Sequence, residues 1–190
     1  ELTGTSMRTL VKEGDLEPPP FAFEAVLSIL SILKDKKLIG DKVHLPILGI
    51  MPSREARNSG VIAVLLEVAN QKVKKYGDQL RHSVPDFDWI YKRTVKHLLE
   101  ARVEEMQAVH GDLCPENILL DANGKVTAVL DWGFMSLFGD STLDASFTCG
   151  IYNMYGPYHR QIDDMFLKAC EARLVYSREQ LLLYRALYAI

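Results

Sequence analysis

Cysteine is scarce in this sequence of 190 residues. The three cysteines, Cys114, Cys149 and Cys170, are an odd number at wide spacing, and no two of them form a Cys-x-x-Cys pair. Zinc sites and dithiol redox centres use closely spaced cysteines, so neither class of site is indicated. We expect free thiols, and this expectation favours a reducing, cytoplasmic setting.

Long hydrophobic runs and clusters of one charge are also lacking. The longest apolar stretch, Phe21 to Leu33, is interrupted by Glu24 and is too short to cross a bilayer. No charged-then-apolar leader opens the chain. The net charge is only -3 and the basic residues are scattered, which argues against a nucleic-acid surface or an electrostatic membrane anchor. Small or neutral partners fit better, and the oligomeric state stays open.

Composition and periodicity predict one mainly helical domain, residues 1–190. With 48% hydrophobic residues the chain can bury one sizeable core, so a second domain is not required. Apolar residues recur at helical spacing in three early ranges and again later, and Leu98 and Leu99 belong to the apolar pattern of the third range. The predicted helices cover Phe21–Lys34, Glu55–Tyr76 and Asp86–Met106, and further helices begin near Leu143, Gln161 and Ser177.

A short β-hairpin is expected to interrupt the helices. The apolar runs Ile118 to Leu120 and Val126 to Leu130 are joined by residues 121–125. Asn123-Gly124 in this connection is a strong hairpin signal, because both residues tolerate the positive φ that a tight hairpin turn needs. The predicted fold class is therefore α+β, mainly α with a small β-hairpin.

The hairpin is flanked by residues that suit phosphoryl transfer. This reaction needs a carboxylate that orients the attacking hydroxyl and oxygen ligands that hold magnesium against the phosphates of ATP. We expect Asp112 to be the general base. Asn117 begins the first strand and Asp131 follows the second, so strand pairing brings two oxygen ligands for Mg2+ together. Leu119 and Leu130 lie on the same hairpin and could form the floor of an adenine pocket.

The string from His110 to Asn117 resembles the catalytic loop of the aminoglycoside phosphotransferase and choline kinase superfamily, His-Gly-Asp-x-x-x-x-Asn. The metal aspartate of that family typically precedes a tryptophan, as Asp131 does here, and residues 139–144 are similar to its Gly-Asp-x-x-x-Asp element. The resemblance implies a kinase-like fold, with Asp144 supporting the catalytic loop and His110 as a structural partner within it.

The first seven residues are similar to the hinge between the two lobes in the same family. This implies that Glu1 and Leu2 contact the nucleotide and that the chain is the C-terminal lobe, starting at the hinge. The small lobe, with its glycine-rich loop and ATP-binding lysine, is not found in these 190 residues, because the region from Phe21 to Met106 reads as helices. On that interpretation the isolated chain is inactive and binds ATP weakly.

Three functions remain open at this point. The preferred one is an ATP-dependent kinase acting on a hydroxyl of a small molecule, with an aminoglycoside, choline or homoserine-like acceptor. A non-catalytic lobe that binds a small molecule or a partner is the alternative. A protein kinase fragment is less favoured, because Gly111 replaces the usual arginine, Cys114 replaces the usual lysine, and no Ala-Pro-Glu follows.

The acceptor cannot be deduced from the remaining motifs. Asp163, Asp164 and Glu171 could attract a cationic acceptor, although acidic residues on a helix more often form a solvated face. Aromatic residues at helical spacing, such as Trp89, are more often core than ligand contacts, and no site role is assigned to them.

Overall fold

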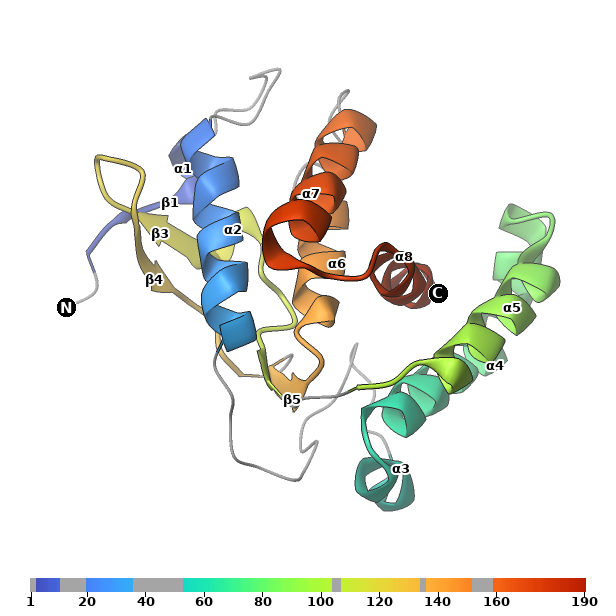
Figure 1. Cartoon of the computed structure of the whole chain (residues 1–190). Helices are drawn as coiled ribbons and strands as arrows, with labels where there is room; N and C mark the ends of the chain where they lie inside the picture. Colours follow the sequence, from blue (N-terminus) through green and yellow to red (C-terminus); the bar gives the residue numbers. More distant parts are fainter. Residues whose placement is uncertain (1–2, 11–19, 36–52, 104–106, 134–135, 152–158) are drawn as a thin grey trace.

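The computed structural model describes residues 3–10, 20–35, 53–103, 107–133, 136–151 and 159–190 (Figure 1). A short 3-10 helix, Pro115–Asn117, lies in these ranges and ends at Asn117, which was expected to begin the first hairpin strand. The ranges also contain eight α-helices and five strands. In chain order they are β1 Thr5–Ser6, α1 Met7–Leu10, α2 Pro20–Asp35, α3 Arg54–Ser59, α4 Val61–Ser83, α5 Phe87–Glu100, β2 Gln107–Val109, β3 Ile118–Leu120, β4 Val126–Val129, β5 Leu137–Gly139, α6 Thr142–Ile151, α7 His159–Leu174 and α8 Arg178–Tyr188.

The mainly helical fold with a small antiparallel sheet confirms the predicted fold class. In Figure 1 the strands β1, β3 and β4 lie with α2 at one side of the molecule and α4 and α5 lie at the other, with α6, α7 and α8 between them. The predicted helix Phe21–Lys34 corresponds to α2. Ser177, where the last helix was expected to begin, is the N-cap of α8, and its side chain accepts a hydrogen bond from the Gln180 N–H.

Two of the predicted helices have different limits. The range Glu55–Tyr76 is divided into α3 and α4 by Gly60, whose φ of 97° ends the first helix. The helix predicted over Asp86–Met106 ends at Glu100, because Ala101 has an extended backbone. Leu99 was expected in the apolar pattern of this helix, but its side chain is 65% exposed.

The hairpin forms as predicted but has a third strand and a wider turn. Strand β1 pairs antiparallel with β3, which gives the order β1-β3-β4. In the turn only Gly124 has positive φ, 76°, so the expected tight Asn-Gly turn is wrong. Asp121 stabilises the turn instead, because its carboxylate accepts the N–H groups of Asn123 at 2.8 Å and Lys125 at 2.9 Å.

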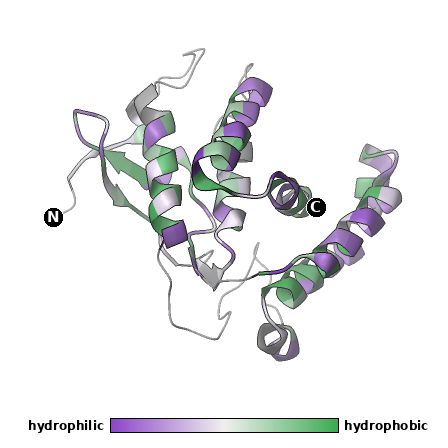
Figure 2. Ribbon diagram, viewed as in Figure 1, coloured by the Kyte–Doolittle hydropathy of each residue, from purple (hydrophilic) through white to green (hydrophobic). Residues whose placement is uncertain are grey.

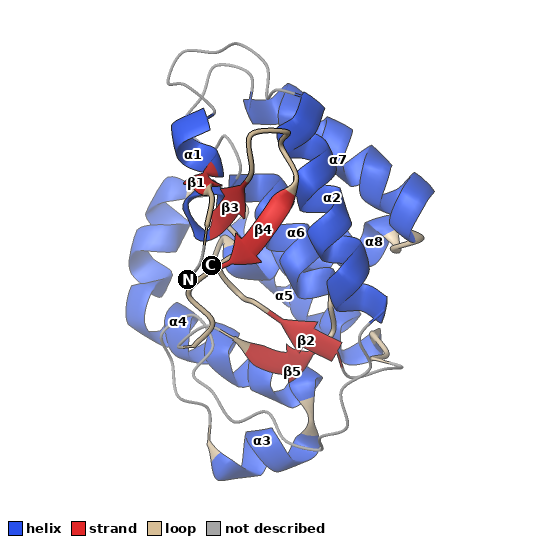
Figure 3. Cartoon of the chain, turned by 90° about the vertical axis from the view of Figure 1, so that its left-hand side faces the viewer, coloured by secondary structure: helices blue, strands red, loops and turns tan. Residues whose placement is uncertain are grey.

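A second, two-stranded sheet was not predicted. Strands β2 and β5 pair antiparallel, with Ala108 opposite Phe138, and Figure 3 shows this pair apart from the three-stranded sheet. Gly139 lies at the end of β5. This pairing brings the chain just before His110 next to the chain just before α6.

Two hydrophobic clusters form the interior. The first joins α2, the hairpin and α7, and the second joins α4, α5, α6 and α8. Figure 2 shows β3 and β4 as largely hydrophobic and the α4 and α5 helices as amphipathic. Val109 belongs to the second cluster and Leu113 to the first, and each is 1% exposed. Residues 110–112 therefore run from one cluster to the other, which fixes both ends of this loop.

Two of the three cysteines lie among the described side chains. Neither Cys114 nor Cys170 forms a disulfide, and burial is the main cause that raises the pKa of Cys114. Over the described ranges, every helix is too short or too polar to span a bilayer.

Candidate active site

The loop of residues 110–112, which we call the His-Gly-Asp loop, follows β2. The carboxylate of Asp144 accepts two main-chain groups of this loop, the His110 N–H at 2.6 Å and the Gly111 N–H at 2.8 Å. Asp144 is 1% exposed and lies in the first turn of α6. Gly111 has a φ of 82°, which favours glycine at this position. Asp144 therefore lies where the sequence placed the support for this loop.

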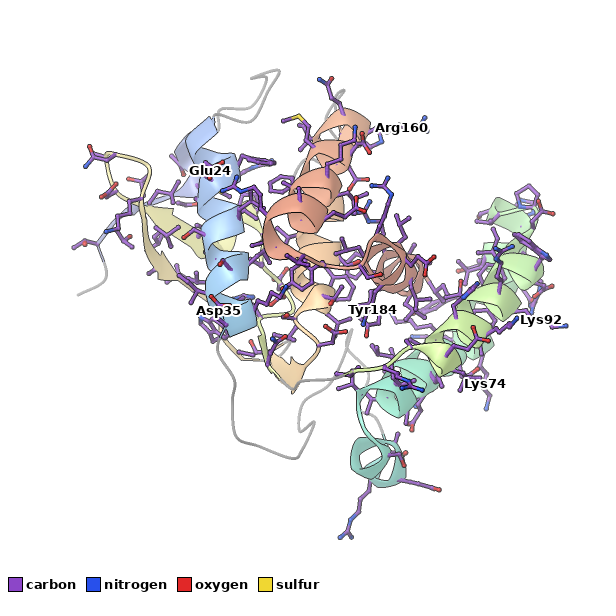
Figure 4. All side chains as sticks on the ribbon, in the orientation of Figure 1. Glu24, Asp35, Lys74, Lys92, Arg160 and Tyr184 are labelled. Atoms are coloured by element: carbon purple, nitrogen blue, oxygen red, sulfur yellow. The ribbon has the colours of Figure 1, made fainter. Side chains whose placement is uncertain are left out.

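Helix α6 is itself fixed at its N-terminus. Asp140 accepts the N–H of Thr142 at 2.9 Å and its hydroxyl at 2.6 Å. The other carboxylate oxygen of Asp140 accepts the hydroxyl of Tyr184 at 2.9 Å. Tyr184 lies on α8 (Figure 4). Ala145 packs in the first hydrophobic cluster and Leu143 in the second. The position of Asp144 thus follows from a helix anchored in both clusters.

His110 connects the loop to the end of the hairpin. Its Nδ1 accepts the Asp112 N–H at 3.2 Å, so the neutral ring carries its proton on Nε2 and donates it to the Leu130 carbonyl at 2.7 Å. The ring is fully buried and meets the Trp132 ring edge-on, with 4.7 Å between centroids. His110 thus lies as a structural partner of the loop, as the resemblance implied.

Asn117 lies directly beside Asp112. Its side-chain amide donates to the Asp112 carbonyl at 2.9 Å and faces a carboxylate oxygen of Asp112 at 3.4 Å. Its own carbonyl accepts the Leu130 N–H at 2.8 Å, which begins the pairing of the two hairpin strands. Because the amide nitrogen is bonded to Asp112, the amide oxygen is the atom of this side chain that could bind a cation.

Asp131 directly follows Leu130. The Leu130 N–H donates to the Asn117 carbonyl, and the Leu130 carbonyl accepts the His110 ring N–H. Asp131 is exposed and has a φ of 60°, which is unusual for a residue other than glycine. Asp112 is half-buried. The hairpin therefore brings the main chain of Leu130, directly before Asp131, next to Asn117 and His110, and Asn117 lies beside Asp112.

The side chains of Asn117 and Asp131 fit a magnesium ion. Both offer oxygen, the ligand atom that a hard cation prefers, and Mg2+ usually takes one or two protein ligands together with water and phosphate oxygens. Groups of three or more His, Cys, Asp or Glu side chains that could hold a metal do not occur in the described ranges.

An apolar strip continues from Asn117 along the hairpin. Ile118 and Leu120 are buried in the first cluster, so Leu119 points to the opposite face, where it is half-buried. Ala128 is paired with Leu119, and Leu130, two residues after Ala128, is also half-buried. The register of the hairpin thus places a third apolar residue, Ala128, on the face that carries Leu119 and Leu130. Glu1 and Leu2 lie outside the described residues.

The acidic residues of α7 are engaged within the chain. Asp163 pairs with Arg185 at 2.5 Å, and Arg178 lies 2.8 Å from Glu171 and 3.7 Å from Asp164. These carboxylates therefore already have cationic partners, which favours the interpretation as a charged helix surface over an acceptor site.

The buried Asp144 gives the site a pH dependence. Burial raises its pKa from the ordinary 3.8 to about 6, against the opposing effect of the Gly111 and His110 N–H groups. Below about pH 6 the protonated group accepts these N–H groups less well, so we expect turnover to fall.

Stability should change in the opposite direction. The folded pKa is higher than the unfolded one, so the contribution of Asp144 to the free energy of unfolding increases as the pH falls from about 6 towards 4. A pH–rate profile and denaturant unfolding at the same pH values check both trends, with Asp144→Asn as the reference. A rate that is constant from pH 7 to pH 5 would contradict this prediction.

The fold and the geometry of the His-Gly-Asp loop define the C-terminal lobe of a kinase-like protein. The model of the phosphotransferase enzyme family matches residues 50–181. The chain belongs to this family, which confirms the resemblance to the aminoglycoside phosphotransferases. No match was found among curated protein sequences.

Solved structures of aminoglycoside phosphotransferases share the fold. A thermostable mutant of APH(4)-Ia, in ternary complex with AMP-PNP and hygromycin B, has a TM-score of 0.67 and 19% identity, covering 98% of this chain and 59% of that chain. APH(3'')-Id from Streptomyces rimosus has a TM-score of 0.56 and 18% identity, covering 98% of this chain and 63% of that chain. The chain thus spans about six tenths of the length of these proteins.

Proposed function

We propose that these 190 residues form a single C-terminal lobe of an ATP-dependent phosphotransferase, which moves the γ-phosphoryl group to a hydroxyl of a small molecule. Family membership supports the reaction class. The observation that carries the proposal is the double contact of the Asn117 amide with Asp112, through the main-chain carbonyl and through the carboxylate. A base and a metal ligand are thereby held as one unit.

Asp112 acts as the general base in this proposal. Its carboxylate orients the acceptor hydroxyl and takes its proton as the new P–O bond forms. The half-buried position leaves the carboxylate accessible to a substrate. Asp144 bonds the main chain before it, at the N–H groups of His110 and Gly111, and the His110 ring accepts its own N–H.

Asn117 and Asp131 are proposed to hold Mg2+. The ion would neutralise charge on the phosphates. Leu119 and Leu130 present the apolar face on which the adenine would lie, and residues 1–7, with Glu1 and Leu2, are proposed as the interlobe hinge that contacts the nucleotide. Strand β1 supports the hinge proposal, because its pairing with β3 places Thr5 opposite Leu120, next to Leu119.

A hydroxylated small molecule is the proposed acceptor. The structures that share the fold include complexes with hygromycin B and with streptomycin, both of which accompany a nucleotide or its analogue. An aminoglycoside is therefore the first acceptor to test, and choline and homoserine-like alcohols are the others. The experiment is acceptor-dependent ADP formation by the complete protein with ATP and Mg2+, with the phosphate ester identified by mass spectrometry. ADP formation that does not change with any of these acceptors would oppose the proposal.

A non-catalytic role of the lobe is the second candidate, because the described residues contain neither the glycine-rich loop nor the strand lysine that contact the phosphates in kinases. Those elements supply much of the phosphate contact in kinases, so we expect the isolated chain to bind ATP weakly, with a Kd well above the micromolar range. Isothermal titration with ATP, with and without Mg2+, measures this. Magnesium-dependent micromolar binding by the 190 residues alone would contradict the expectation.

A further inference from the structure

The proposed site is assembled from two segments that are far apart in the sequence. One is the His-Gly-Asp loop, residues 110–112, and the other is residues 131–133, which we call the Asp-Trp-Gly segment. The His110 ring N–H donates to the carbonyl of Leu130, the residue that precedes the second segment. The C-terminal end of the Asp-Trp-Gly segment must also be bonded to the rest of the fold. Otherwise the exposed carboxylate of Asp131 would lie on an unattached turn and would not keep a fixed position.

Ser136 makes this connection. Its hydroxyl accepts the Gly133 N–H at 3.0 Å and donates its proton to the His110 carbonyl at 3.0 Å. The Ser136 N–H donates to the Gly133 carbonyl, also at 3.0 Å, which closes the turn. A hydroxyl can accept and donate at the same time, so a single side chain joins both segments.

The conformation of Asp131 explains why both ends must be held. A non-glycine residue in the left-handed region is strained and persists only where its surroundings fix it. Asp131 has a φ of 60°, with the bonded Leu130 before it and Gly133 two residues after it. Without the Ser136 hydroxyl, Gly133 loses one of its two bonds to Ser136 and the His110 carbonyl loses its bond to Ser136, so of these contacts only the His110–Trp132 ring contact still joins the loop to this segment.

We infer that Ser136 is a positioning residue, which rests on the proposed function: it fixes the Asp131 carboxylate relative to Asp112 for binding of magnesium and ATP. It acts through Gly133 and His110 and does not itself touch the substrate. Residues that orient metal ligands typically change metal affinity about 10- to 100-fold when they are replaced.

The test uses the complete protein with Trp89→Phe. Trp132 is then the tryptophan of this lobe whose fluorescence is measured. Trp132 donates its indole N–H to the Val129 carbonyl at 3.0 Å and contacts the His110 ring, so its emission reports the Asp-Trp-Gly segment. Ser136→Ala is compared with Ser136→Thr, which keeps the hydroxyl. Ser59→Ala is the matched control, because that hydroxyl donates only to Glu55 on the remote helix α3.

For Ser136→Ala we expect the Mg2+ concentration at half-maximal rate to rise about 10-fold or more. Trp132 emission, measured without nucleotide or metal, should shift to the red and become easier to quench with acrylamide. The Tm should remain close to that of the parent protein, and Ser136→Thr should restore both readouts. Ser59→Ala should change neither.

The inference is overturned if Ser136→Ala leaves both the magnesium dependence and the Trp132 emission unchanged. It is also overturned if Ser136→Thr is as defective as Ser136→Ala, since the hydroxyl is then not the relevant group. If the parent protein transfers no phosphate, the proposed function fails, but the Trp132 emission still decides whether Ser136 holds the segment. A shifted emission in that case supports the connection, and an unshifted one opposes it.

Discussion

Replacing Asp112 with alanine should lower kcat of the complete protein by about 10²- to 10⁴-fold, the usual contribution of a general base. This corresponds to about 3 to 5 kcal/mol of transition-state stabilisation. The loop should keep its shape, because the 2.9 Å bond from Asn117 goes to the main-chain carbonyl of Asp112 and does not depend on the replaced side chain. Asp112 is half-buried and lies outside both hydrophobic clusters, so the Tm should change little.

Asp86→Ala is the matched control, because this exposed aspartate precedes α5 and its side chain does not cap the helix. Its kcat should equal that of the parent. Asp112→Asn distinguishes orientation of the acceptor hydroxyl from removal of its proton, since an amide can still orient the hydroxyl but does not accept the proton. Steady-state kinetics at saturating ATP measure all three variants. Turnover by Asp112→Ala at the parental rate would refute its role as the base.

The helices could be predicted where one face is buried along its whole length. In α2 the buried residues include Val26, Leu30 and Leu33, which recur at helical spacing, and the predicted range is correct to one residue at each end. In α5 the same method extended the helix beyond Glu100. Leu99 is apolar but 65% exposed, so composition indicated burial that tertiary packing does not provide.

The short strands were missed for a different reason. Strands β1 and β5 have two and three residues, too few for a periodic pattern. Their partners lie far along the chain, as Thr5 opposite Leu120 shows, so pairing and not local propensity makes them strands. The turn at Asp121 was missed because its carboxylate competes with the Asn-Gly pair, and its two bonds to the backbone determine the turn.

The candidate site could be predicted further than the fold around it. Asp112, Asn117 and Asp131 form an ordered motif whose spacing is explained by one hairpin, and Asp144 follows from a second motif. Ser136 had no such signal, because a lone serine five residues after Asp131 is identified only by its hydrogen bonds.

The structure adds the reason why these motifs belong together. The His-Gly-Asp loop runs between Val109 in one hydrophobic cluster and Leu113 in the other, and α6 packs against both clusters. A carboxylate in the first turn of α6 can therefore hold the middle of the loop while the clusters hold its ends. This arrangement makes Asp144 the residue whose loss should separate stability from activity most clearly.

Asp144→Ala should lower kcat at least 100-fold while changing the free energy of unfolding by only a few kcal/mol. The two backbone N–H groups left without an acceptor cost about 1 to 3 kcal/mol each. Burial raises the pKa of Asp144 from 3.8 to about 6 in spite of both N–H bonds, so burying the charged carboxylate at neutral pH has a cost that the mutation removes. These two effects largely offset each other in stability. In activity they do not, because a loop that moves by about 1 Å can lose about 10²-fold in rate.

Asp144→Asn separates the role of the two hydrogen bonds from the role of the titrating carboxylate. The asparagine offers one oxygen to one N–H, and its amide nitrogen meets the other N–H, donor against donor, so we expect an intermediate rate. Because asparagine does not titrate, the fall in rate near pH 6 should be absent in this variant. Steady-state kinetics and denaturant unfolding from pH 5 to pH 8 measure all of these quantities. Parental turnover in Asp144→Ala would show that the loop keeps its position without this carboxylate. A fall near pH 6 that persists in Asp144→Asn would assign the titration to another group.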